Sequence, residues 1–168
     1  MSESVAVGIE RPRQPALLDL LRQSDEFTLA LYPPESAHLL DIEELEAPDV
    51  TVFVARDDDS AEHPAVGMAA LVNRGDGSAE LKRMFVPAAV RGRGIAGIIL
   101  RAIERFAQRS GITLIQLETG PLQPAAIALY ERQGYVLIPN FGKYVGDPNS
   151  VCYEKHLADG ATAAPPRD

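Results

Sequence analysis

The alternation of apolar and polar residues divides the first half of the chain into short elements joined by polar turns. Two helices are expected at 16–23 and 35–45, with an irregular link at 24–34, because Pro33 and Pro34 cannot continue a helix. Three runs rich in apolar and β-branched residues then predict an antiparallel meander, whose strands lie at 50–57, 65–73 and 79–86.

The second half begins with an amphipathic helix. Its apolar side chains recur in steps of three and four, at Ile95, Ile98, Ile99, Ala102, Ile103 and Phe106. A strand at 112–118 follows, then a helix at 124–134 with proline in its first turn and glycine at its end. Two last strands are expected at 135–138 and 150–157. The order α α β β β α β α β β predicts an α/β fold with a mixed sheet.

Length and composition are those of one globular domain, with 168 residues, 46% of them hydrophobic and 24% charged. We expect a flexible N-terminus at 1–14, a single domain at 15–157 and a disordered tail at 158–168. No apolar run approaches the roughly 20 residues that span a bilayer, and the N-terminus does not resemble a signal peptide. With a single cysteine, Cys152, these features favour a cytoplasmic protein without a membrane partner.

Charge is unevenly distributed along the chain. The net charge of −8 argues against a nucleic-acid-binding protein. From Leu81 to Arg109, however, seven bases and one acid give a charge of +6, which leaves −14 for the remainder. A basic island of this kind suits a compact polyanionic ligand. An arginine-rich, solvated helix face would give the same pattern.

The segment RGRGIAG at 91–97 fits two phosphate-binding patterns. Read as G-x-G-x-x-G it is a dinucleotide fingerprint, and Glu118 then stands about 20 residues further on, where a ribose-binding acid is expected. Read as R-x-x-G-x-A it is an acyl-CoA pyrophosphate loop. The context favours the second interpretation, because four residues separate Val86 from the loop and three antiparallel strands precede it. In either case, backbone N–H groups at a helix start bind the phosphate.

Three segments carry a family resemblance: AELKRMFVPAAVRGRGIAGIILRAIERFA, ITLIQLETG and QPAAIALYERQGY. In this order and spacing, over roughly residues 79–138, the chain resembles the GNAT N-acetyltransferase superfamily. The resemblance implies an acyl-CoA N-acyltransferase fold in which the central strands splay apart. It also implies acetyl-CoA as the cosubstrate, with its pantetheine arm in the cleft between those strands. The residues that match its binding positions are Met84, Phe85, Val86, Arg91, Gly92, Arg93, Gly94, Ile95, Ala96 and Gln123.

The same resemblance suggests catalytic residues. Tyr130 matches the family's usual acid, which protonates the leaving thiolate. Glu80 is the leading candidate for the base and Glu118 is its rival, while ordered water is a third alternative. A base is required because a primary amine, with a pKa of about 10, is mostly protonated at neutral pH.

The acceptor is less clearly indicated. Asp25 and Glu26 are candidates to attract a cationic amine, with Phe27 and Tyr32 as an apolar wall. The segment 139–150 is long for a hairpin, so we predict a binding loop or the contact of a homodimer. The three histidines lack metal-ligand spacing, and no metal site is expected.

The sequence therefore predicts an acetyl-CoA-dependent N-acetyltransferase of a small amine, amino acid or peptide. A non-catalytic acyl-CoA-binding module on the same fold is the main alternative. A dinucleotide-dependent oxidoreductase is the third.

Overall fold

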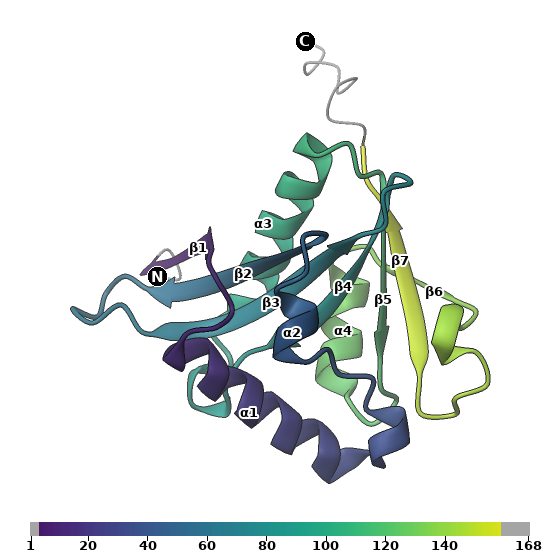
Figure 1. Cartoon of the computed structure of the whole chain (residues 1–168), viewed down its shortest axis with the longest axis horizontal. Coiled ribbons are helices and arrows are strands. Elements are labelled where there is room, and N and C mark those ends of the chain that lie inside the picture. Colours follow the sequence, from purple (N-terminus) through teal and green to yellow (C-terminus); the bar gives the residue numbers. More distant parts are fainter. Residues whose placement is uncertain (1–3, 159–168) are drawn as a thin grey trace.

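The computed structural model describes residues 4–158, and the predicted tail lies outside the described residues from position 159 onward. A seven-stranded sheet in the order β1-β2-β3-β4-β5-β7-β6 forms its centre. In Figure 1, α1 and α2 lie in front of this sheet and α3 and α4 lie behind it. The elements are β1 (Val5–Ile9), α1 (Pro15–Leu31), α2 (Ile42–Leu45), β2 (Val50–Asp57), β3 (Ala65–Asn73), β4 (Ser78–Phe85), α3 (Ile95–Arg109), β5 (Leu114–Thr119), α4 (Pro124–Arg132), β6 (Val136–Ile138) and β7 (Val151–His156).

The predicted mixed sheet and the order of its elements are confirmed from α1 onward. The strand β1 was not predicted. Its five residues lie within the segment expected to be flexible, and they pair antiparallel with β2 from Val5 opposite Asp57 to Ile9 opposite Phe53. No helix among the described residues is both long and apolar enough to cross a membrane.

The first helix is longer than predicted. The irregular link expected at 24–34 is wrong, because α1 continues through this segment to Leu31 and ends just before the two prolines. Its buried face continues the spacing of Leu17, Leu20 and Leu21 to Ser24, a small polar residue that hides the pattern in the sequence. The second predicted helix is also wrong in length, since it is reduced to the single turn of α2.

The sheet carries an apolar core on each face, because successive residues of a strand point to opposite sides. On β2 and β3, Phe53, Ala55, Ala69 and Leu71 face the core under α3 and α4. Their neighbours face the core under α1 and α2, which contains Val52, Val54, Met68 and Ala70. The helices therefore hold the central strands from both sides.

A β-bulge interrupts β4. Met68 pairs with Phe85 and Ala70 pairs with Lys82, so β4 has one residue more than β3 over the same length. Arg83 lies in the bulge with a φ of 59°, a conformation rare for residues other than glycine. The extra residue reverses the two faces of β4. Leu81 therefore faces the core under α3, whereas Phe85 faces the core under α1.

Candidate active site

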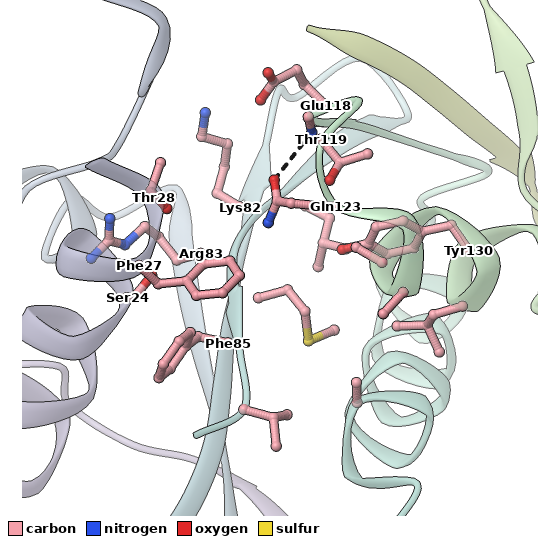
Figure 2. A pocket seen from close by; sticks show the side chains of 18 of the residues that line it. Ser24, Phe27, Thr28, Lys82, Arg83, Phe85, Glu118, Thr119, Gln123 and Tyr130 are labelled. Carbon is pink, nitrogen blue, oxygen red and sulfur yellow. Dashed lines mark hydrogen bonds between the residues drawn. The ribbon is translucent and has the colours of Figure 1, made fainter. Parts of the chain in front are cut away.

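A cleft opens where β4 and β5 diverge. The two strands pair in parallel from Ser78 opposite Leu114 to Leu81 opposite Leu117, and beyond these residues the pairing stops. The predicted splay is thus confirmed. A cavity of about 660 Å³ occupies the gap, and its walls come from β4, β5, α1, α3 and α4. Figure 2 shows Phe27 and Tyr130 approaching from opposite sides of this cleft.

The glycine-rich loop forms one end of the cleft, which Gly92, Gly94, Ile95, Ala96 and Gly97 line. Gly92 and Gly94 have φ values of 85° and 74°, which only glycine adopts without strain. Gly94 begins α3 without a side-chain cap. Within residues 4–158, the backbone N–H groups from Gly92 to Gly97 have no protein acceptor. This row of free donors at a helix N-terminus is suited to bind an anion such as a phosphate.

Of the two arginines in the loop, only Arg91 faces the cleft. Its guanidinium lies 5.1 Å from the centre of the Phe27 ring and its Nε donates to the Val86 carbonyl over 3.0 Å. Arg93 is not among the residues that line the cleft, and it donates to Asp57 over 3.2 Å. We therefore expect only the backbone of Arg93 to face a ligand in the loop.

The remaining predicted cofactor positions all line the cleft. Met84, Phe85 and Val86 form one wall, and all three lie beyond Leu81, the last residue of β4 that pairs with β5. Gln123 forms part of another wall and accepts from the Gly120 N–H over 3.2 Å, so it closes the turn before α4. The unpaired strand edge leaves main-chain groups available to an extended ligand.

Tyr130 lines the cleft from α4 and is 95% buried, since only 5% of it is exposed. It packs edge-on against Tyr135. Burial, together with the negative charge of Glu118, raises the pKa of the Tyr130 phenol. The phenol therefore stays protonated and can donate a hydrogen bond into the cleft.

The two candidate bases differ in their surroundings. Glu118 lines the cleft, and burial raises its pKa to about 7, although a hydrogen bond of 2.7 Å from Ser150 opposes this shift. Glu80 is not among the lining residues. It accepts a hydrogen bond of 2.6 Å from the Tyr144 hydroxyl and lies 3.5 Å from Arg74. The geometry thus favours Glu118 over Glu80, the leading candidate in the sequence.

The predicted acceptor residues are divided between the cleft and the outer surface. Phe27 and Tyr32 line the cleft, and the Tyr32 hydroxyl accepts from the Leu122 N–H over 2.8 Å. Asp25 and Glu26 are not lining residues. Asp25 lies 2.8 Å from the buried guanidinium of Arg83, and Glu26 accepts from Arg22 on the exposed face of α1.

A polar network that no sequence pattern indicated lies at the end of the cleft away from the glycine-rich loop. The Lys82 ammonium donates to the Tyr144 hydroxyl over 2.6 Å and to the His38 carbonyl over 3.0 Å. The His38 imidazole in turn lies 2.6 Å from Asp147, which brings the 139–150 loop against the segment after α1. These partners are 44 to 109 residues apart in the sequence, so no local pattern reveals them.

A family model described as "Acetyltransferase (GNAT) family" matches residues 15–135. The chain belongs to this family. GNAT relatives include an IAA acetyltransferase of Azospirillum brasilense, 39% identical over 92% of this chain and 99% of the relative. An N-acetyltransferase of Bacillus subtilis is 34% identical over 74% of this chain and 82% of the relative. The match sets aside the oxidoreductase alternative.

Solved structures agree with the GNAT assignment. A Klebsiella pneumoniae protein described as an acyl-CoA N-acyltransferase has a TM-score of 0.76 and 30% identity, over 92% of this chain and 98% of that one. PaiA N-acetyltransferase of Thermoplasma acidophilum, solved with coenzyme A, has a TM-score of 0.68 over 90% of this chain and 99% of that one. At 18% identity, the second likeness concerns the fold alone.

Proposed function

We propose that this GNAT protein transfers the acetyl group of acetyl-CoA to the nitrogen of a primary amine. One observation carries the proposal: the free N–H groups at the start of α3 line the same cleft as Glu118 and Tyr130. An anion-binding end and an end with acid–base groups are what a diphosphate-bearing acyl donor and an amine acceptor require. The coenzyme A of the Thermoplasma protein is consistent with such a donor.

The residues of the cleft fit acetyl-CoA in type and position. Gly92 to Gly97 would bind the pyrophosphate through their N–H groups, assisted by the positive charge of Arg91. The unpaired edge of β4 at Met84 to Val86 would bind the amide groups of the pantetheine arm as a neighbouring strand does. The thioester then lies near the level at which β4 and β5 separate.

The proposed chemistry is a direct attack of the amine nitrogen on the thioester carbonyl carbon. Glu118 accepts the proton that the amine must lose, and a pKa of about 7 leaves a large share of this carboxyl group ionised at neutral pH. The carbon–sulfur bond then breaks. Tyr130, whose phenol stays protonated, donates a hydrogen bond to the departing sulfur.

A thiol-release assay with acetyl-CoA, run over a panel of amines, amino acids and peptides, tests the proposal. We expect release that depends on the acceptor, together with an N-acetylated product identified by mass spectrometry. Tight binding of coenzyme A without any such product would contradict catalysis and would indicate an acyl-CoA-binding module instead.

The loop is tested separately through the affinity for coenzyme A. Arg91→Gln should weaken it about 10-fold or more, because a charge-assisted contact with phosphate is lost. Arg105→Gln is the matched control, since Arg105 is exposed on α3 and does not line the cleft. Equal affinities of the two variants, measured by calorimetry, would contradict the placement of the pyrophosphate.

A further inference from the structure

The acceptor end of the cleft contains a buried cation, Lys82. Only 8% of its side chain is exposed, yet it lines the cleft, and Figure 2 shows it at the same end as Glu118. An ammonium group has three donors. Two of them are used by the Tyr144 hydroxyl and the His38 carbonyl. The third has no acceptor within hydrogen-bonding distance among residues 4–158.

Among residues 4–158, no carboxylate accepts a hydrogen bond from the Lys82 ammonium. Its nearest carboxylate is Glu80, at 3.8 Å, and Glu80 already accepts from Tyr144 and lies 3.5 Å from Arg74. Burial lowers the pKa of the Lys82 ammonium, which indicates that its positive charge is poorly solvated there. A buried cation of this kind is stabilised by an anion that enters the cleft and accepts its free donor.

The other basic residues that line the cleft are His38, Arg83, Arg91 and Arg132. The His38 imidazole lies 2.6 Å from Asp147, and Arg132 is in the last turn of α4. Arg83 points to α1, where it lies 2.8 Å from Asp25. Arg91 lies over Phe27 beside the glycine-rich loop. At the acceptor end, Lys82 and Glu118 therefore stand together as a cation and a carboxylate, which is the complement of a ligand that carries both a carboxylate and an amine.

We propose that the acceptor is an amine that also bears a carboxylate group, such as an amino acid, and that Lys82 binds this carboxylate while Glu118 receives the amine. The inference rests on the proposed function. It adds a substrate class and a residue that determines specificity.

Activity is tested with amino acids and their carboxamides, which have nearly the same size and differ in charge. The wild-type protein should show a higher kcat/KM for the acid than for the amide. Lys82→Met should reduce this preference about 10- to 100-fold, the effect of losing a charge-assisted hydrogen bond. Lys82→Arg should retain most of the preference. Equal kcat/KM values for acid and amide with the wild-type protein would overturn the inference while leaving amine acetylation intact.

Lys143→Met is the matched control. Lys143 is exposed, lies 5.7 Å from the same Tyr144 ring and does not line the cleft. It should keep the wild-type preference for the acid. If Lys143→Met lost the preference as Lys82→Met does, the preference would be due to positive charge in general and not to a contact with Lys82. The inference would then be wrong.

A binding measurement decides the matter independently of turnover. With coenzyme A present, calorimetry of N-acetylated amino acids should show tighter binding than their amides, and Lys82→Met should remove the difference. Thermal denaturation of each variant establishes that it is folded. Acid and amide products that bind equally to the wild-type protein would overturn the inference, whether or not any amine is acetylated.

Discussion

At the scale of single residues, two glutamates of the candidate site have the same side chain but different surroundings, and these surroundings give them different roles. Glu80 lies where β4 and β5 are still paired, opposite Gln116, and hydrogen bonding to Tyr144 occupies it. Glu118 lies just past the last residue of β5 that pairs with β4, although it still pairs with Cys152 of β7, and there its side chain reaches the cleft. Burial then raises its pKa to about 7, which a base that works near neutral pH requires.

This difference predicts the pH dependence of the reaction. A base must be ionised, so kcat/KM, which reports on groups of the free protein, should rise with pH through a midpoint near 7, the pKa of Glu118. Glu118→Gln should lower kcat about 100-fold or more and remove this inflection, leaving only the limb due to the amine at higher pH. Glu80→Gln is the control and should keep the inflection at a slightly lower pH, because the charge of Glu80 is the smallest of the causes that raise the pKa of Glu118. A Glu118→Gln profile with the wild-type inflection would remove Glu118 from the proton transfer.

Residues that recur in short patterns could be predicted from the sequence, whereas residues that meet through the fold could not. The glycine-rich loop could be predicted because it depends on neighbouring residues alone: Gly92 and Gly94 adopt the positive φ angles that the turn before α3 requires. The basic island is not a single surface. Lys82 turns to Tyr144, Arg83 to Asp25 and Arg93 to Asp57, so three neighbouring charges serve three different contacts. The directions of Lys82 and Arg83 depend on the bulge in β4, which the sequence does not mark.

At the scale of the elements, the end of α1 is fitted closely against the end of β5. A Cβ atom on Gly120, just after β5, would lie 1.9 Å from the Tyr32 hydroxyl oxygen. This hydroxyl also accepts from the Leu122 N–H, which holds the turn before α4. Three elements that line the cleft therefore meet at one glycine, and this contact fixes the width of the cleft at that point.

Gly120→Ala should consequently destabilise the protein. The rigid Tyr32 ring must move, at a cost of about 1–3 kcal/mol for overpacking, which corresponds to a fall in Tm of roughly 2–10 °C. Gly8→Ala is the matched control, because a Cβ there meets nothing within 4 Å, and its Tm should stay close to the wild-type value. Differential scanning calorimetry makes the comparison. A Gly120→Ala protein as stable as the control would show that Tyr32 moves without penalty.

At the scale of the whole molecule, β1 completes one side of the sheet. It covers the edge of β2, and its residues Val5 and Val7 pack against the core under α3. An ion pair of 2.8 Å between Arg56 and Glu10 ties the chain after β1 to the same edge. Unpaired strand edges are sites at which chains associate, so β1 protects the sheet as well as enlarging its core.

Removing residues 1–9 should therefore lower the Tm by several degrees and promote aggregation on heating. The physical reason is twofold, since apolar area is lost from the core and the backbone groups of β2 become exposed. Ile9→Ser serves as the control, because Ile9 is 58% exposed and its replacement should change the Tm little. Light scattering during thermal denaturation measures both effects. A shortened protein that melts and scatters like the full chain would contradict this role of β1.

The single extra residue at Arg83 makes chain length matter more than side-chain identity in β4. Deleting any one residue between Lys82 and Phe85 would remove the bulge and shift the register of β4 by one residue. Every side chain beyond it would change sides, and no single compensating substitution would restore the order. Natural or laboratory variation in this strand should therefore accumulate as replacements, while insertions and deletions are confined to the turns on either side.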